Sequence, residues 1–348
     1  MMEWDYAKSK AVYGHFQDEY SRFIYEGRVM YCLTGDITYM NRVSRAVLDR
    51  DVLDGLMRDL SKISEHLIIR GAGNDYLVLK ELYPSFEFKC FCDYDPKKIG
   101  QIIDGKRVIS PEEFYNEYAD HYVLINSAAA NGEILDELRS HGIPEERIYN
   151  LATAYEGICD RQYFEKEFLS VWEDEIFIDG GCYDGRTVRQ FINYCNGKYK
   201  KIYSLEPDKD NYALAKASFE KAPVRDLQLI NKGLWKQSAT LSFSGGASQG
   251  AKITENGTYT IDTVSIDELV GEDKVTYIKL DIEGTESEAL QGAEKTIKRC
   301  HPKLAISIYH KPEDIFELPD LILSMQNDYR FYLRHYQLGQ YETILYAV

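Results

Sequence analysis

The chain repeats one pattern twice: a short apolar segment, a polar or glycine-containing turn, and then a segment with helical periodicity. In the first half, the apolar segments are residues 66–70, 86–92 and 122–126. In the second half, they are residues 175–179, 202–206, 227–231, 275–281 and 304–309. Strands that alternate with helices form parallel sheets whose two faces are covered by helices. The sequence therefore predicts an α/β protein with two tandem Rossmann-like, doubly wound sheets.

The pattern divides the chain into three regions. Residues 1–64 show helical spacing only and are expected to form a helical cap. Residues 65–150 are expected to form the first Rossmann-like unit, which would position a nucleotide or a substrate. Residues 151–348 are expected to form the second unit, entered through a helical linker over residues 155–169.

Two features interrupt the second unit. Residues 239–266 have the composition of an inserted β-rich region around a glycine and serine loop that contains Gly245, Gly246 and Gly250. Residues 331–347 read as two strands around a turn at Gly339, which predicts a terminal hairpin.

The acidic character of the chain limits its partners. Lys and Arg number 41 against 57 Asp and Glu, which gives a formal charge of −16. Nucleic-acid binders and polybasic membrane binders need a positive surface, so neither partner is expected. No apolar stretch reaches the roughly 20 residues of a membrane span, and residues 1–6 lack the features of a signal peptide. Seven scattered cysteines without a CxxC pair suit a reducing compartment, so we expect a cytoplasmic protein.

The strongest local signal is the turn that follows the first strand of the second unit. Asp179 ends this strand, and Gly180, Gly181 and Gly185 follow it before a helix. Glycines let the backbone approach a ligand closely, and a helix N-terminus offers free N–H groups. The glycine spacing does not match the dinucleotide fingerprint GxGxxG. An acid beside glycines suits instead a ligand with an ammonium group, which Asp179 could face.

The second strand of this unit ends in Leu205-Glu206-Pro207. An acid at this strand tip lies where a ribose diol binds in such folds, and its two oxygens can accept both hydroxyl protons. Together with the glycine turn, Glu206 favours a nucleoside-containing ligand.

Two further strand ends carry candidate catalytic residues. Asp281 ends the fourth strand, and His310 follows the fifth. If these strands are neighbours, both side chains reach one cleft at the carboxyl edge of the sheet. Either could remove a proton from an acceptor. A metal held by Asp281, Glu283 or His310 could lower the pKa of an acceptor hydroxyl instead, but no ligand spacing requires one, and no metal ligand is assigned.

The order of these motifs resembles the FkbM family of S-adenosylmethionine-dependent methyltransferases. The resemblance covers residues 176–348. It rests on four segments: Ile178-Asp179-Gly180-Gly181-Cys182-Tyr183-Asp184-Gly185, Leu205-Glu206-Pro207-Asp208, Asp262-Thr263-Val264-Ser265-Ile266-Asp267-Glu268-Leu269, and Ile278-Lys279-Leu280-Asp281-Ile282-Glu283-Gly284-Thr285-Glu286. The first segment often has Ala-Asn in the family where this chain has Cys182-Tyr183.

The resemblance implies a class I methyltransferase sheet with a reversed C-terminal strand and S-adenosylmethionine as the cofactor. It also implies methyl transfer to a hydroxyl oxygen of a sugar or secondary metabolite. The expected catalytic residues are His310 and Asp281. The expected cofactor-binding residues are Asp179, Gly180, Gly181, Tyr183, Gly185, Glu206 and Asn231.

The first unit has a weaker signal. Gly71-Ala72-Gly73 lacks the third glycine of GxGxxG, although Asp93 lies near the expected ribose-binding position. The unit resembles the small Rossmann-like modules attached to sugar-modifying enzymes, which bind a nucleotide-sugar head group or serve as scaffolds. Four cationic residues could contact phosphate or form a solvated loop: Lys97, Lys98, Lys106 and Arg107.

Two alternatives stay open beside an O-methyltransferase acting on a small-molecule acceptor. One is an NAD-dependent oxidoreductase that works through the first unit. The other is a non-catalytic protein that binds a nucleotide or sugar. The sequence does not decide between a monomer and a homo-oligomer.

Overall fold

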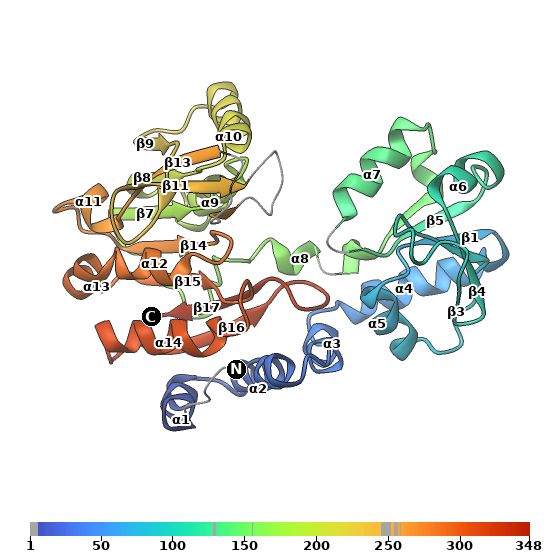
Figure 1. Ribbon diagram of the computed structural model, residues 1–348, viewed down its shortest axis with the longest axis horizontal. Coiled ribbons are helices and arrows are strands. Elements are labelled where there is room, and N and C mark those ends of the chain that lie inside the picture. Colours follow the sequence, from blue (N-terminus) through green and yellow to red (C-terminus); the bar gives the residue numbers. More distant parts are fainter. Residues whose placement is uncertain (1–5, 128–129, 155, 245–251, 254–256, 258) are drawn as a thin grey trace. The chain divides into compact units, whose positions relative to one another are not determined.

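A computed structural model describes residues 1–348 except 1–5, 128–129, 155, 245–251, 254–256 and 258. The chain divides into two compact units (Figure 1). Unit 1 contains residues 1–35, 161–335 and 342–348, and unit 2 contains residues 36–160 and 336–341. Among the described residues, no helix combines the length and apolar character needed to cross a membrane.

Unit 1 is built on a seven-stranded sheet in the order β16-β17-β15-β14-β7-β8-β9. Its strands are β7 (Glu175–Gly180), β8 (Tyr199–Leu205), β9 (Leu227–Ile230), β14 (Tyr277–Leu280), β15 (Lys303–Ser307), β16 (Phe331–His335) and β17 (Thr343–Ala347). In Figure 1 the sheet runs from β9 at the top of the unit to β16 at the bottom. Only β17 runs antiparallel to its neighbours, β15 and β16. The predicted sheet with a reversed C-terminal strand is confirmed.

The central strands form where the sequence is mostly apolar, as expected for strands covered on both faces. All residues of β7, β14 and β15 are buried. The helices of unit 1 in the described part of the chain are α1 (Tyr6–His15), α2 (Glu19–Thr34), α9 (Arg186–Tyr194), α10 (Lys209–Lys221), α11 (Ile266–Val270), α12 (Glu286–Gln291), α13 (Glu294–Cys300) and α14 (Asp314–Met325).

The predicted β-rich insertion forms a small second sheet in the order β10-β13-β11-β12. Its strands are β10 (Gly233–Leu234), β11 (Ala239–Ser244), β12 (Lys252–Ile253) and β13 (Tyr259–Val264). The predicted loop with Gly245, Gly246 and Gly250 lies outside the described residues.

Unit 2 is a second α/β sheet, in the order β3-β4-β2-β1-β5-β6. Its strands are β1 (Leu67–Arg70), β2 (Cys90–Cys92), β3 (Ile102–Ile103), β4 (Lys106–Ile109), β5 (Tyr122–Ile125) and β6 (Ile148–Asn150). All pairings are parallel except that of β3 with β4. Its described helices are α3 (Thr38–Arg45), α4 (Arg50–Ser61), α5 (Asn74–Leu82), α6 (Pro111–Glu117), α7 (Asn131–Ser140) and α8 (Glu156–Cys159), with short 3₁₀ turns at Ser64–His66, Glu145–Arg147 and Leu151–Ala154.

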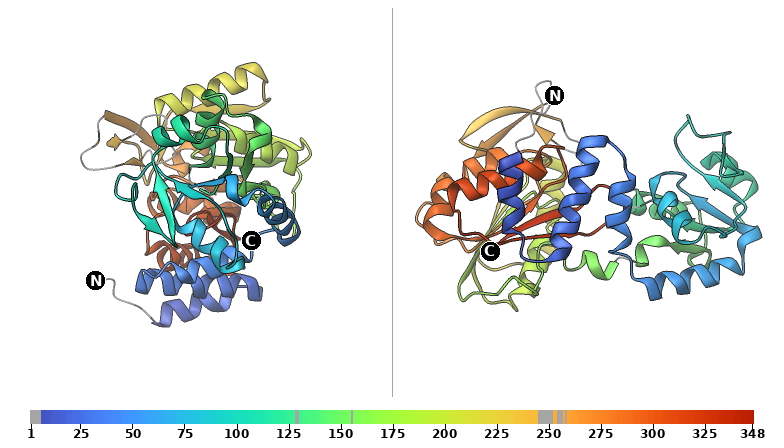
Figure 2. Two further views of the ribbon diagram at one scale, coloured as in Figure 1. Left: turned by 90° about the vertical axis from the view of Figure 1, so that its right-hand side faces the viewer. Right: turned by 90° about the horizontal axis from the view of Figure 1, so that it is seen from below.

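Residues 1–64 do not form one separate cap, because their helices are divided between the two units. Figure 2 shows α1 and α2, in blue, beside the red C-terminal elements. Ser21 Oγ on α2 accepts a hydrogen bond from the backbone N–H of Leu333 at 2.9 Å, and Arg28 donates to Thr343 Oγ1 at 2.7 Å. These contacts fix α2 to the edge of the unit 1 sheet.

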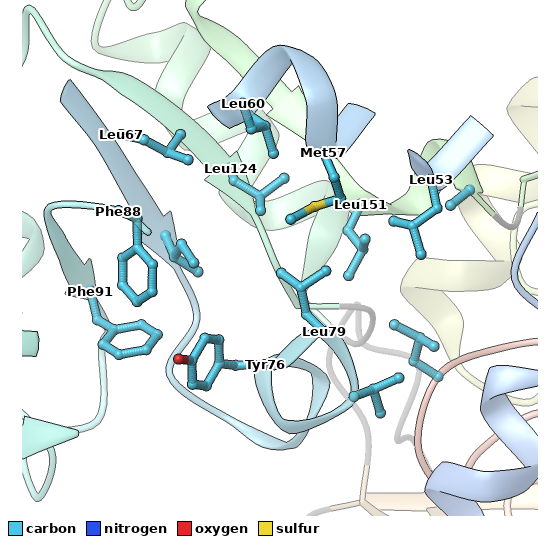
Figure 3. Close-up of a cluster of buried hydrophobic side chains, with 14 of the residues drawn as sticks. Leu53, Met57, Leu60, Leu67, Tyr76, Leu79, Phe88, Phe91, Leu124 and Leu151 are labelled. Atoms are coloured by element: carbon cyan, nitrogen blue, oxygen red, sulfur yellow. The ribbon is translucent and has the colours of Figure 1, made fainter. Parts of the chain in front are cut away.

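Helix α4 instead completes the core of unit 2. Its apolar stripe, Leu53, Met57 and Leu60, packs with buried side chains of the unit 2 sheet and of α5 (Figure 3). A helix with one apolar face must bury it against another element, and for α4 that element is this sheet.

The predicted helical linker over residues 155–169 is wrong in extent. Only Glu156–Cys159 is helical among its described residues, and its first residue, Tyr155, lies outside them. Tyr163 has a φ of +69°, a left-handed conformation that a right-handed helix cannot continue through.

Candidate active site

Four neighbouring strands of unit 1 deliver the predicted site residues to one edge of the sheet. Strands β8, β7, β14 and β15 are consecutive in the sheet and mutually parallel. Their carboxyl ends therefore meet at the same edge, where open α/β sheets bind their ligands. The residues that end or follow these strands are, in the same order, Glu206, Asp179, Asp281 and His310.

The turn after β7 comes so close to the chain after β14 that it has no room for a side chain. Gly181 has a φ of +77°, and a Cβ placed on it would lie 1.9 Å from the carbonyl oxygen of Asp281. Gly185 has a φ of +82°, and its Cβ would lie 2.4 Å from the ring of Phe219. Both positions therefore require glycine, and helix α9 begins directly after this turn.

The carboxylate of Asp179 lies beneath the glycine turn. It is fully buried, and the Nζ atom of Lys279 lies 3.2 Å from its Oδ1 atom. Lys279 also donates hydrogen bonds to the carbonyl oxygens of Gly180 at 2.9 Å and Gly181 at 2.7 Å. Burial raises the pKa of Asp179, and the ammonium of Lys279 opposes that shift. These contacts give Asp179 a part in shaping the turn, while its contact with a ligand ammonium stays a prediction.

Glu206 is held at the tip of β8 by backbone donors. Its Oε2 accepts a hydrogen bond from the N–H of Tyr183 at 2.9 Å, and its Oε1 accepts one from the N–H of Asp208 at 3.0 Å. Burial raises the pKa of Glu206 to about 7. Each carboxylate oxygen keeps a second lone pair. This fixed carboxylate can therefore accept two further hydrogen bonds, one from each hydroxyl of a diol.

Tyr183 and Asn231 support Glu206 in different ways. Tyr183 has a φ of +51°, and its backbone N–H donates to the carboxylate. The side chain of Asn231 donates to the carbonyl oxygens of Glu206 at 2.8 Å and Pro207 at 3.1 Å. Asn231 is thereby a positioning residue for the strand tip, and its predicted contact with a cofactor stays a prediction.

Two tyrosines hold the carboxylate of Asp281. Tyr163 Oη donates to Asp281 Oδ2 at 2.7 Å, and Tyr309 Oη donates to Oδ1 at 3.0 Å. Burial disfavours the charged form, but Lys279 and His310 outweigh it and keep the pKa of Asp281 below its ordinary value. Asp281 is therefore ionised at neutral pH. Tyr163 carries no local sequence signal that connects it with Asp281, so its role emerges only from the structure.

His310 is surrounded by carboxylates. Its Nδ1 atom lies 3.0 Å from Glu286 Oε1, and its Nε2 atom lies 3.5 Å from Asp281 Oδ1 and 3.7 Å from Glu283 Oε2. Burial lowers the pKa of the imidazole, but these carboxylates outweigh it and raise the pKa to about 9. The ring is thus charged at neutral pH, and Asp281 is the better proton acceptor of the two predicted residues.

The same cluster offers ligand atoms for a metal ion. Suitable atoms of Asp281, Glu286 and His310 all lie within 4.8 Å of one another. Asp281, Glu283 and His310 are the residues that the sequence suggests for this chemistry, and the structure adds Glu286 from the first turn of α12.

In unit 2, the predicted phosphate-binding cations are largely engaged with acids. Lys106 pairs with Glu87 at 2.7 Å, and Arg107 pairs with Glu113 at 2.7 Å. Lys98 lies 3.1 Å from Asp93, whose carboxylate also accepts from the N–H of Ala72 at 2.8 Å. Asp93 therefore closes the Gly71-Ala72-Gly73 turn of its own unit, a contact that does not require a ligand.

The sheet order, the reversed strand and the acid-tipped strand ends define unit 1 as a methyltransferase-type α/β unit. The comparisons agree with this class. Residues 179–333 match the family model described as methyltransferase FkbM domain. The chain therefore carries an FkbM methyltransferase domain, as the motifs predicted. Residues 63–149 match a second family model, described as C2185-like, N-terminal.

One solved structure shows the same fold, and two others are similar over about half of the chain. The methyltransferase FkbM from Methylobacillus flagellatus is 21% identical, with a TM-score of 0.50, and the match covers 90% of this chain and 100% of that one. An rRNA methylase from Streptococcus thermophilus is 14% identical, with a TM-score of 0.35, covering 51% of this chain and 87% of that one. A putative methyltransferase from Streptococcus mutans, solved with SAH, is 12% identical, with a TM-score of 0.35. The match covers 56% of this chain and 98% of that one. None of the curated proteins matches the chain.

Proposed function

We propose that this protein transfers a methyl group from S-adenosylmethionine to a hydroxyl oxygen of a small acceptor, a sugar or a secondary metabolite. The observation that carries the proposal is the contact between two strand ends. The glycine turn after β7 packs directly on the backbone of Asp281 after β14. A ligand held by the turn therefore lies next to an ionised carboxylate that can take a proton.

The residues of the site fit this cofactor. Glu206 presents a fixed carboxylate at the strand tip where a ribose diol binds. The turn at Gly181 and Gly185 packs closely on Asp281 and Phe219, and α9 begins directly after it. S-adenosylmethionine supplies, when bound, a methyl group that its sulfonium already activates.

Because the methyl group is already activated, the residues of the protein need only align the acceptor and remove its proton. Asp281 is ionised and held by two tyrosine hydroxyls, so it can accept the hydroxyl proton in one fixed geometry. His310 is charged and lies 3.5 Å from Asp281, so it stabilises the ionised carboxylate.

We place this activity in the cytoplasm as part of the same proposal. All seven cysteines are free thiols in the structure. This use of cysteine is typical of a reducing compartment.

Ligand binding tests the proposal. The melting temperature of the protein is measured with S-adenosylhomocysteine, S-adenosylmethionine, NAD and NADP. We expect the first two to raise it and the nicotinamide cofactors to leave it unchanged. The variant Glu206→Gln should lose most of the shift. The control Glu220→Gln, an exposed acid on α10, should keep it. A shift with NAD alone would point to an oxidoreductase and overturn the proposal.

A further inference from the structure

The carboxyl edge of the unit 1 sheet gathers several acidic side chains around one histidine. Asp281, Glu283 and Glu286 surround the single imidazole of His310. Glu342 approaches the same cluster, because the hydroxyl of Tyr309 lies 3.4 Å from Glu342 Oε1 and donates to Asp281 at 3.0 Å. Several acids around one histidine are a common environment for a divalent cation.

A second observation points to a ligand. The side chain of His310 is 10% exposed and that of Glu286 is fully buried. Among the described residues, the Nε2 atom of His310 and the Oε2 atom of Glu286 are buried without a hydrogen-bond partner. Buried polar atoms are nearly always satisfied in native proteins, so such orphans call for an absent ion or water.

The distances also suit a cation better than hydrogen bonds. His310 Nε2 lies 3.5 Å from Asp281 Oδ1 and 3.7 Å from Glu283 Oε2, both too long for a good hydrogen bond. Two ligands that each lie about 2.1 Å from one cation are about 3.0 to 3.5 Å apart at tetrahedral or octahedral angles. The Nε2 atom of His310 is already at or within a few tenths of an ångström of this spacing from Asp281 Oδ1 and from Glu283 Oε2.

Glu286 contacts the imidazole of His310 rather than the cation. It faces the opposite ring nitrogen, with its Oε1 atom 3.0 Å from His310 Nδ1. Its own position is fixed, because Oε1 also accepts the N–H of Ile282 at 2.9 Å. A carboxylate on the far nitrogen of a metal-binding histidine fixes the ring orientation and tautomer, an arrangement that recurs in metal sites.

We propose that Asp281, Glu283 and His310 bind one divalent cation of the Mn²⁺ type, with Glu286 orienting the imidazole. Two carboxylates and one imidazole match the ligand preferences of such a cation and leave coordination positions open. The consequence for catalysis rests on the proposed function: an acceptor hydroxyl that takes an open position loses its proton more easily.

Direct titration tests the site without any acceptor. Chelator-treated protein is titrated with Mn²⁺ at constant pH, and free Mn²⁺ is followed by electron paramagnetic resonance. We expect one bound ion per chain. Glu283→Gln should weaken binding at least tenfold, and Glu286→Gln should weaken it less, because the amide oxygen can still accept from the ring. The surface control Glu220→Gln should bind like the unaltered chain.

The outcomes separate this inference from the proposed function. Circular dichroism first establishes that each variant is folded, and Glu283→Gln is the main variant because the glutamate side chain is partly exposed. Binding of S-adenosylhomocysteine without any Mn²⁺ binding would overturn the metal site and leave the methyltransferase assignment standing. Equal Mn²⁺ affinity in Glu283→Gln and the unaltered protein would also overturn it, since the ion would then sit elsewhere.

Discussion

The Nζ atom of Lys279 lies 3.2 Å from the Oδ1 atom of Asp179, and both side chains are buried beneath the glycine turn of unit 1. The same ammonium donates to the carbonyl oxygens of Gly180 and Gly181. Removing one partner of a buried ion pair leaves an uncompensated charge, which is more costly than losing the pair as a whole.

Lys279→Met should therefore lower the free energy of unfolding by about 3–5 kcal/mol. The double variant Asp179→Asn/Lys279→Met should recover part of this loss, because neither charge is then left alone. Urea unfolding of unit 1 measures both. The control Lys298→Met breaks an exposed pair with Glu294 and should cost less than about 1 kcal/mol. Equal costs for the two lysines would contradict the role of the buried pair.

Gly181→Ala should abolish ligand binding by unit 1. The new methyl group would lie 1.9 Å from the carbonyl oxygen of Asp281, so the turn must move away from the β14 end. Gly197→Ala is a matched control, because Gly197 has a similar φ of +71° but nothing within 4 Å of its added Cβ. Calorimetry with S-adenosylhomocysteine should show no binding for the first variant and unchanged affinity for the second. Normal binding by Gly181→Ala would show that the close approach is not needed.

Glu206 should make stability depend on pH in a defined direction. Its pKa is raised from 4.5 to about 7 by burial, so the folded chain keeps a proton that the unfolded chain releases. Since the folded state then binds more protons between these values, this group's contribution to stability falls as pH rises from about 4.5 to about 7.

The difference in unfolding free energy between the unaltered protein and Glu206→Gln isolates this group. As pH rises from 5 to 8, the unfolding free energy of the unaltered protein should fall relative to that of Glu206→Gln. A difference that does not change with pH would show that the carboxyl group titrates at an ordinary value.

Leu60→Ala should destabilise unit 2 by about 2–5 kcal/mol, because Leu60 is fully buried in the core that α4 completes. Val52→Ala on the same helix is the control, because Val52 is 42% exposed. Thermal unfolding monitored by calorimetry should move the unit 2 transition only for the first variant. If Leu60→Ala cost as little as Val52→Ala, residues 50–61 would behave as the separate cap that their sequence suggested.

The sequence was sufficient to predict those strands and site residues that are marked by their immediate neighbours in the chain. Mostly apolar runs marked the central strands, and the acids that follow them marked Glu206 and Asp281. The convergence of Asp281 and His310 followed from parallel neighbouring strands, whose carboxyl ends share one edge.

The sequence was not sufficient to predict contacts between segments that lie far apart in the chain. Tyr163 donates to Asp281 across 118 residues, and Ser21 accepts from Leu333 across 312. Such pairs depend on tertiary packing, which leaves no periodic trace in either segment. Helical spacing in residues 1–64 likewise revealed the helices but not which sheet each one covers.

Glu206 is proposed to accept hydrogen bonds from the ribose diol of the cofactor in unit 1, and the proposed function depends most on this contact. The direct measurement is a calorimetric cycle with S-adenosylhomocysteine and its 2′,3′-dideoxy analogue, on the unaltered protein and on Glu206→Gln. We expect the analogue to bind the unaltered protein at least tenfold more weakly, about 1.4 kcal/mol. Glu206→Gln should bind both ligands with closely similar, weakened affinities. A variant that discriminates the two ligands as strongly as the unaltered protein would contradict the assignment.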